Sequence, residues 1–405
     1  MLVVAVTCGA AITPEVSAFA TLPLQSDGVV LDAAGMPVAV PVGGDLADDP
    51  ARLAAQDAWL AAGTLPGPEA YAPLAERALR DLDVLVLDNG AALAAVSPDW
   101  RYVWPRDASF TAVALTRTGH QDDAWRVLAY LKQMQDATST DGVFEARYQP
   151  DGSGDVPDGR GAQLDGNGWA LWAVAEWFAG SVPGDHRDRD LEHLRPLVER
   201  SIAAIRAQVD PRTGLPGVFA DYWEVREQVP TLGTLAPLLL GARSSGPVLD
   251  ALGLDPADDV VRLLEAGLRQ FAPTYPRRHG GATPDTAVAF LMPPFAPLDP
   301  QVRTAWLAAA PTMTRSGGGL APGSDWKPDG ISWTPSTAVF ALTAAGCGDV
   351  DAATGRLDWL AAHTTGRGSL PEKVLWDGSP AAVAPLAWTA ALVLLTLDEL
   401  DRQAG

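Results

Sequence analysis

The sequence predicts an all-α protein, an (α/α)6 barrel of twelve helices in two concentric rings, preceded by a short irregular or β-stranded N-terminal arm. Three observations predict this fold. After residue 65 the hydrophobic periodicity is almost entirely helical, and segments rich in Gly, Pro and Asp interrupt it. The helices alternate between amphipathic and wholly apolar. The loops alternate as well, because long loops rich in aromatic and acidic residues precede the apolar helices.

Residues 1–65 are expected to form an arm that packs on the barrel and is not an independent domain, which leaves 66–405 for the barrel. The stretch MLVVAVTCGAAI is apolar but lacks the basic residues of a signal peptide, so we expect an N-terminal strand. The stretch DGVVLDAAGMPVAVP alternates around a glycine, which predicts a hairpin.

The twelve helices differ in which faces are apolar. Odd-numbered members such as DRDLEHLRPLVERSIAAIRAQ have one charged and one apolar face, whereas even-numbered members such as GWALWAVAEWFAG are apolar on all sides. A helix of the second kind must be buried all round, so six of them are expected to form the inner ring. The expected ranges are 68–85, 107–119, 121–136, 167–180, 188–208, 231–241, 255–271, 284–291, 298–310, 335–346, 350–363 and 386–402.

The loops before the inner helices are expected to meet at one end of the barrel, because helices of one ring run parallel. They carry aromatic rings, carboxylates and amides, which predicts a pocket of such groups. The alternative is that long loops simply collect Trp, Gly and Pro. The residues concerned are Trp100, Trp104, Gln163, Asp165, Asp221, Trp223, Glu224, Asp285, Asp325, Trp326, Trp333, Glu372 and Trp376.

Composition excludes several classes of function. The net charge of −21 and the pI near 4.5 oppose binding to nucleic acid. Two cysteines cannot form a disulfide framework, the scattered histidines predict no metal site, and no stretch is long enough for a membrane span. The phosphate-binding GxxxxGK[ST] loop, the dinucleotide GxGxxG turn and the GxSxG nucleophile elbow are all missing. A cytoplasmic location is expected, with secretion as the alternative, and a monomer or small homo-oligomer.

A pocket of flat rings and fixed polar groups suits a sugar, and hydrolysis of a glycoside requires two carboxyl groups. The stretch DYWEVREQVPTLGT offers Glu224 as the general acid, since contact with the indole of Trp223 would desolvate the carboxyl and favour its protonated form. Glu227 is its rival, and a surface or helix-start carboxylate is the alternative.

The second carboxyl candidate is Glu372 in GRGSLPEKVLWDG, a loop position suited to a base that activates water. Asp377 is its rival, and a solvated carboxylate paired with Lys373 is the alternative. Asp107, Asp165 and Asp325 could also be simple N-caps. The acidic stretch DGSGDVPDG at 151–159 resembles a calcium loop only weakly and is expected to be a flexible rim loop.

Five stretches in order resemble the glucoamylase-like enzymes of glycoside hydrolase family 15 over about residues 100 to 400: YVWPRDASF, AQLDGNGWALWA, DYWEVRE, SDWKPDGISW and SLPEKV. The resemblance implies that Arg106 and Asp107 bind the 4- and 6-hydroxyls of the terminal glucose, that Glu224 is the general acid, and that Glu372 is the general base. Further sugar contacts are expected from Trp104, Gln163, Asp165, Trp223, Trp326, Trp333 and Glu227.

The resemblance implies an inverting exo-hydrolase that needs no cofactor and releases β-D-glucose from the non-reducing end of short α-glucosides, with carboxyls about 6.5–9.5 Å apart. The sequence departs from the family pattern at Val225, Ala321 and Gly159, positions around the leaving sugar. We therefore expect α-1,6 substrates such as isomaltose slightly ahead of α-1,4 substrates such as maltose. The missing β-sandwich and starch-binding module favour short oligosaccharides.

Two alternatives remain. A trehalase or an inverting disaccharide phosphorylase could use the same barrel, and Lys373 beside Glu372 could bind phosphate. A non-catalytic sugar-binding barrel is the alternative of another class, and the paired carboxylates argue against it.

Overall fold

The computed structural model of the protein describes residues 19–44, 46, 49–138 and 140–404. The strand expected at the start of the chain lies outside these residues. In the described part no helix is both long and apolar enough to cross a membrane. Helices dominate, and the strands are few and short.

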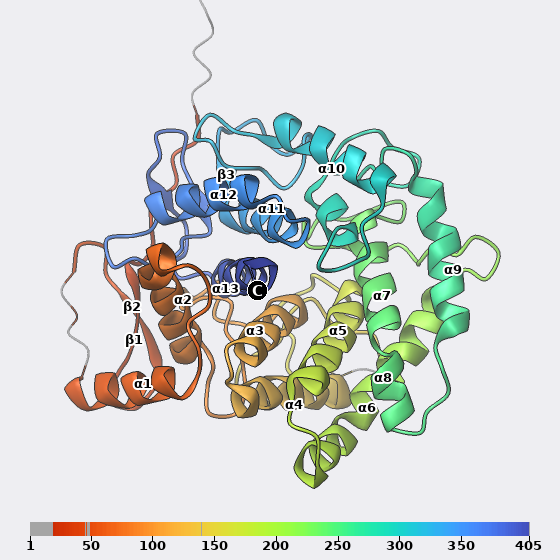
Figure 1. The fold of residues 1–405 in the computed structure, drawn as a ribbon, viewed down its shortest axis with the longest axis horizontal. Coiled ribbons are helices and arrows are strands. Elements are labelled where there is room, and N and C mark those ends of the chain that lie inside the picture. The colour runs from red at the N-terminus through yellow and green to blue at the C-terminus, as the bar shows by residue number, and fades with distance from the viewer. Residues whose placement is uncertain (1–18, 45, 47–48, 139, 405) are drawn as a thin grey trace, which may run out of the picture.

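The inner ring closes on itself. Each inner helix contacts the next, and the last one returns to the first. Figure 1 shows these helices around the centre of the molecule. The members are α3 (Pro105–Arg117), α5 (Asp165–Gly180), α7 (Leu232–Ser244), the 3₁₀ helix η3 (Thr286–Leu291), α11 (Thr334–Gly346) and α13 (Ala387–Ala404). Nearly every side chain of α3, α7 and α11 is buried, as their apolar composition predicts.

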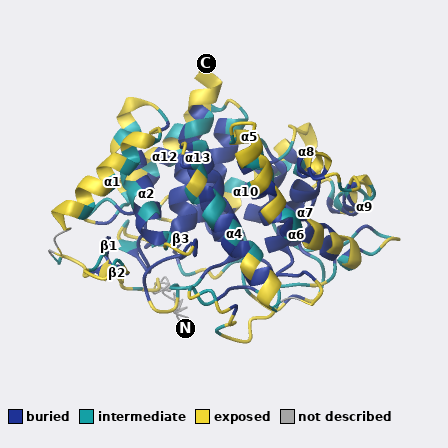
Figure 2. Ribbon diagram, turned by 90° about the horizontal axis from the view of Figure 1, so that it is seen from below, coloured by how far each residue is buried: buried dark blue, intermediate teal, exposed yellow. Residues whose placement is uncertain are grey.

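Six outer helices surround this ring, and each contacts an inner partner: α2 on α13, α4 on α3, α6 on α5, α9 on α7, α10 on η3 and α12 on α11. Figure 2 shows burial at the centre and exposure on the outer helices. The predicted two-ring barrel is therefore confirmed. The outer helices are α2 (Ala72–Leu85), α4 (Gln121–Thr138), α6 (Asp185–Gln208), α9 (Asp258–Leu268), α10 (Pro300–Met313) and α12 (Val350–Ala362).

Three helices differ from the sequence-based expectation. The fourth inner helix is a single short 3₁₀ segment, because Pro293 and Pro294 follow it and supply no backbone N–H to continue a helix. Residues 50–62 form α1 (Pro50–Ala62), capped by the side chain of Asp49, where an irregular arm was expected. The helix α1 buries none of its residues and thus leaves no apolar stripe in the sequence. A short α8 (Gly246–Ala251) follows α7.

The expected hairpin is present in the arm. The strands β1 (Gly28–Leu31) and β2 (Pro37–Val40) pair antiparallel, with Val30 opposite Val38. Gly35 in the turn has φ +82°, which favours glycine. Both β1 and α1 contact α2, so the arm lies against the outer ring.

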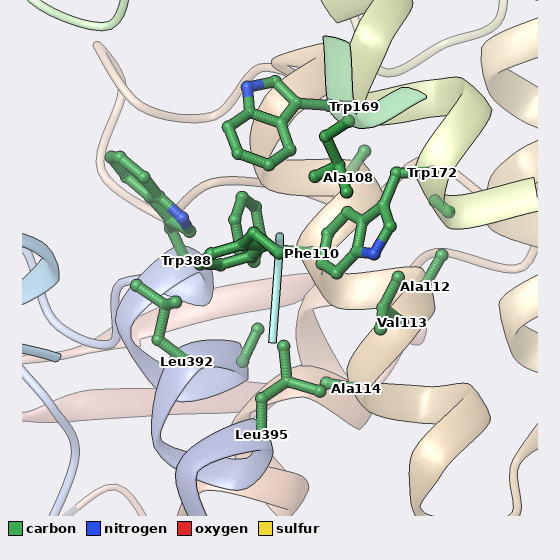
Figure 3. Packing of buried hydrophobic residues seen from close by; sticks show 14 of the residues in the cluster. Ala108, Phe110, Ala112, Val113, Ala114, Trp169, Trp172, Trp388, Leu392 and Leu395 are labelled. Carbon is green, nitrogen blue, oxygen red and sulfur yellow. The ribbon is translucent and has the colours of Figure 1, made fainter. Parts of the chain in front are cut away.

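A cluster of aromatic rings joins three inner helices near the start of α13. Phe110 of α3 lies 4.8 Å from Trp169 and 5.0 Å from Trp172, both on α5, and 5.8 Å from Trp388 of α13, measured between ring centroids. Figure 3 shows these rings packed around Phe110. Aromatic pairs in tilted and edge-on arrangements stabilise the fold beyond the contribution of the apolar area that they bury. The cluster holds the inner helices together near the ends of the long loops that precede them.

Candidate active site

A cavity of about 350 Å³ lies where the loops before α3, α7, α11 and α13 meet. It combines aromatic rings with charged groups, as the loop pattern predicts. Its lining includes Asp99, Trp100, Trp104, Arg106, Asp107, Arg147, Arg160, Tyr222, Trp223, Glu224, Trp326, Trp333, Glu372, Lys373 and Trp388. Most of the predicted site residues are thus brought together from distant parts of the chain.

Arg106 and Asp107 occupy the first turn of α3 at the floor of the cavity. Arg106 Nη2 lies 3.1 Å from Asp107 Oδ2, and its guanidinium lies 4.7 Å from the ring centroid of Trp388. The N-cap of α3 is Trp104, so Asp107 does not cap the helix. Burial raises the pKa of the Asp107 carboxyl, and the charge of Arg106 opposes that rise. The pair forms a buried polar clamp at the base of the cavity.

Several buried polar atoms of cavity-lining residues have no hydrogen-bond partner within the described part of the chain. They include donors, namely Arg106 Nε and Nη1 and the indole nitrogens of Trp223, Trp326, Trp333 and Trp388, whereas the acceptors Asp107 Oδ2 and Glu372 Oε2 are ion-paired with Arg106 and Lys373. Buried polar groups in native proteins are nearly always paired with protein, water or ligand. The arrangement suits a ligand that carries many hydroxyl groups on apolar C–H faces.

Glu224 lies on a tightly turned loop before α7. Its φ is +54°, and its N–H donates to the Asp221 carbonyl at 2.7 Å. One carboxylate oxygen accepts from the indole N–H of Trp104, and the other is paired with Arg160. The left-handed backbone conformation costs about 1 kcal/mol for a residue other than glycine, and the surrounding structure must enforce it.

A buried ion cluster of Arg277, Asp221 and Glu227 holds this loop in place. The guanidinium of Arg277 donates to both oxygens of Asp221, at 2.7 and 2.9 Å, and to Glu227 Oε1 at 2.5 Å. Arg277 is fully buried and lies 3.9 Å from the ring centroid of Trp223. Glu227 also accepts from Arg278 Nε at 2.7 Å. Glu227 therefore belongs to the cluster and does not line the cavity, which distinguishes it from Glu224.

Tyr222 adds a second support beside this cluster. It lines the cavity, and its hydroxyl donates to Asp285 Oδ1 at 2.5 Å. Asp285 caps η3 through the N–H of Ala287. Burial raises the pKa of Asp285 to about 7. This contact links the loop before α7 to the short fourth inner helix.

Glu372 directly precedes β4 (Lys373–Val374), the central strand of a small sheet whose other strands are β3 (Ser332–Trp333) and β5 (Pro380–Ala381). Its N–H donates to the Val383 carbonyl at 2.8 Å, and its carbonyl accepts from the Thr334 N–H at 3.0 Å. These bonds fix its backbone on both sides. Burial raises the pKa of the Glu372 carboxyl, and Lys373 opposes the rise.

The rival of Glu372 is placed elsewhere. Asp377 lies in the exposed β4–β5 turn, where Oδ1 accepts from the Ser379 N–H at 2.9 Å. That hydrogen bond lowers the pKa of Asp377. Asp377 does not line the cavity, so Glu372 is the carboxylate of this segment that faces it.

Gln163 and Asp165 also lie outside the cavity lining, in a buried layer around α5. The N–H of Gln163 donates to the Phe144 carbonyl at 2.8 Å. Asp165 is the first residue of α5 and does not cap it, and its Oδ2 lies 3.9 Å from Arg106 Nη1. Burial raises the pKa of Asp165 to about 7. These residues can act on a ligand only through Arg106 or a similar neighbour.

The sequence motifs did not identify several lining residues, among them Arg147, Arg160, Tyr222 and Trp388. Arg160 directly follows the stretch 151–159 that was expected to be a flexible rim loop, and no helical or strand periodicity marks this position. Trp388 was assigned to a buried helix, and it serves both the core and the cavity. Nothing in the described residues gathers three or more His, Cys, Asp or Glu side chains as a metal would require.

No family model matches the chain. The isomaltose glucohydrolase of Kribbella flavida is 25% identical over 341 residues, which are 74% of this chain and 84% of that protein. A glycosidase solved in complex with glucose has a TM-score of 0.67 at 23% identity, covering 81% of this chain and 96% of that one. A bacterial glucoamylase complexed with acarbose has a TM-score of 0.68 at 15% identity, covering 85% and 58%. These comparisons confirm the predicted resemblance, the barrel fold and the enzyme class, a glycoside hydrolase.

Proposed function

We propose that this glucoamylase-like glycoside hydrolase releases β-D-glucose from the non-reducing end of short α-glucosides by inversion, with Glu224 as general acid and Glu372 as general base. One observation carries the proposal. Both carboxylates line one cavity with the Arg106–Asp107 clamp and with buried N–H donors that have no hydrogen-bond partner in the described residues. That set matches a sugar ring whose hydroxyls satisfy the polar atoms while aromatic faces cover its C–H surfaces.

In the proposed reaction Glu224 donates its proton to the glycosidic oxygen as the bond to the anomeric carbon breaks. Water attacks that carbon from the opposite face and gives its proton to Glu372. Inversion follows, because attack and departure occur on opposite faces of the ring. The Arg106–Asp107 clamp would hold the terminal glucose so that its anomeric carbon lies between the two carboxyls.

The proposed preferred linkage is α-1,6, as in isomaltose, with α-1,4 as the second candidate. Two observations support this order. The matched relative from Kribbella flavida is named for isomaltose. The resemblance to the family also implies altered contacts with the leaving sugar, since the chain departs from the family pattern at Val225, Ala321 and Gly159. A panel of α-1,1, α-1,2, α-1,3, α-1,4 and α-1,6 glucose disaccharides scored for glucose release tests the order, and activity confined to the α-1,1 sugar would identify a trehalase.

A disaccharide phosphorylase is the second candidate, because Lys373 lines the cavity beside Glu372. The same panel run with and without inorganic phosphate separates the two functions. A hydrolase releases free glucose at a rate that is independent of phosphate. Phosphate-dependent turnover with glucose 1-phosphate as product would replace the hydrolase proposal.

The catalytic roles are tested by Glu224→Gln and Glu372→Gln, each expected to lower the rate of glucose release by about 100-fold or more. Glu265→Gln is the matched control, since Glu265 is an outer-helix carboxylate paired with Arg243 and remote from the cavity lining. NMR of fresh product is expected to show the β-anomer. Nearly full activity of either cavity variant, or an α-anomer as first product, would refute the proposed mechanism.

A further inference from the structure

Each of the two glutamates that line the cavity, Glu224 and Glu372, is paired with a cation, but the two cations are held in different ways. Lys373 follows Glu372 on β4, is stacked 4.2 Å from the Trp333 ring centroid, and has a side chain only 15% exposed. Arg160 reaches Glu224 from the position directly after the rim loop 151–159, and its side chain is 37% exposed. The partner of the base is therefore fixed in the fold, whereas the partner of the acid comes from a surface loop.

Arg160 has a second carboxylate partner within its own loop. Its Nε donates to Asp158 Oδ2 at 2.9 Å. Asp158 also accepts from Arg147, whose Nη1 donates to the Asp99 carbonyl at 2.7 Å and whose guanidinium lies 4.2 Å from the Tyr102 ring centroid. Asp158 is thus a fixed anchor. Arg160 can leave Glu224 and still keep an ion pair.

The space beside Arg160 is open. Gly159 and Gly161 flank it, and a Cβ added at either position would meet no atom within 4 Å. The backbone is held in place, because the Gly161 carbonyl accepts from the Ala146 N–H at 3.1 Å. A release of Glu224 therefore requires only a rotation of the Arg160 side chain, which no packed neighbour at positions 159 and 161 opposes.

The present arrangement is incompatible with proton donation by Glu224. Trp104 occupies one of its oxygens and Arg160 the other, and a guanidinium stabilises the carboxylate over the protonated acid. A general acid must carry its proton and lie within about 2.6–3.2 Å of the glycosidic oxygen. The Arg160 contact must therefore open before a glycoside can be protonated.

We propose that Arg160 is a latch on the leaving-sugar side of the cavity, which pairs with both Glu224 and Asp158 in the free enzyme and releases Glu224, but keeps Asp158, when the leaving sugar enters. Its departure allows Glu224 to take up a proton. The inference rests on the proposed function, since it assigns the acid role to Glu224. Arg160 is in this view a positioning residue that couples substrate binding to protonation of the acid. The other charged groups that line the cavity are Asp99, Arg106, Asp107, Arg147, Glu372 and Lys373.

Proton uptake on binding tests the latch without relying on turnover. Isomaltose or maltose is titrated calorimetrically into Glu372→Gln at pH 7, in buffers of different ionisation enthalpy. The latch predicts uptake of up to about one proton per bound sugar. Adding Glu224→Gln should abolish the uptake, because no acid remains to be protonated. Adding Arg160→Gln should reduce it at least about twofold, since the carboxyl is then no longer held ionised before binding.

The matched control is Arg206→Gln on the Glu372→Gln background. Arg206 pairs with Asp259 at 2.8 Å on the outer surface, so the change removes the same charge far from the cavity lining. Its proton uptake should equal that of Glu372→Gln alone. Binding without proton uptake, or uptake that Arg160→Gln leaves unchanged, overturns the latch.

Kinetics provide a second readout. The basic limb of the pH profile of kcat/KM gives the pKa of the general acid in the free enzyme. The basic limb of kcat gives the pKa of the same group in the enzyme–substrate complex. Arg160→Gln should move the limb of kcat/KM towards higher pH by about one unit and leave the limb of kcat in place. Equal shifts in both limbs contradict the latch. Failure of the wild type to hydrolyse any disaccharide instead refutes the proposed function, whatever the calorimetry gives.

Discussion

The ammonium nitrogen of Lys373 lies 3.2 Å from Oε2 of Glu372, and both side chains line the same cavity. Burial raises the pKa of this glutamate, whereas the adjacent ammonium lowers it. A general base must be ionised to accept a proton from water. Lys373 therefore offsets part of the penalty that burial imposes on the base.

Replacing Lys373 by Met should raise the pKa of Glu372 further, since the opposing charge is lost. Activity falls when pH drops through the pKa of the base, so the acidic limb of kcat/KM should move to higher pH by about one unit or more. Lys373→Arg should largely restore the limb. A full pH profile of each variant measures this shift, and an unmoved acidic limb in Lys373→Met would show that the ammonium has no influence on the base.

Asp107→Ala should lower activity strongly while the barrel stays folded. Asp107 lines the cavity, and Arg106 Nη2, 3.1 Å from its Oδ2, holds the carboxylate beside the space that a ligand would fill. We expect kcat/KM to fall about 100-fold or more, since charged hydrogen bonds contribute about 1.5–3 kcal/mol each. Thermal unfolding should remain cooperative. Full activity in a folded variant would assign Asp107 a structural role only.

Arg277→Met should destabilise the fold more than any surface change. The substitution leaves Asp221 and Glu227 buried without their shared cation, and breaking a buried pair costs about 3–5 kcal/mol. Urea unfolding measures the free energy of unfolding. The control Arg243→Met breaks an outer pair with Glu265, which should matter by about 1 kcal/mol or less. Equal losses in the two variants would contradict the support role of the buried cluster.

Gly168→Ala should push the inner helices α5 and α7 apart and lower the free energy of unfolding. An added Cβ would lie 2.2 Å from the carbonyl oxygen of Pro237, so the backbones of α5 and α7 touch at this point. We expect a loss of about 1–3 kcal/mol through overpacking. Gly355→Ala on α12 is the control. Its Cβ meets no atom within 4 Å, so better helix propensity should stabilise the protein by about 0.5–1 kcal/mol. Matching changes in stability for the two variants would argue against close contact between α5 and α7.

Much of this protein could be predicted from its sequence, because burial on every side leaves a plain signal. Inner helices such as α11 and α13 are apolar all round, and that pattern predicted which helices form the inner ring. Parallel inner helices then bring their preceding loops to one face, which predicted that Arg106, Glu224 and Glu372 meet. The helix α1 escaped prediction because it buries no residue.

Only the tertiary structure separated Glu224 from Glu227, three positions away on the same loop. Arg277 lies 50 positions downstream of Glu227 and holds it in the buried cluster, which leaves Glu224 to line the cavity. Likewise, the pairing of Arg160 with Glu224 joins two loops that share no local pattern. Periodicity records which face of an element is buried, but long-range ion pairs depend on where the closed ring places each loop.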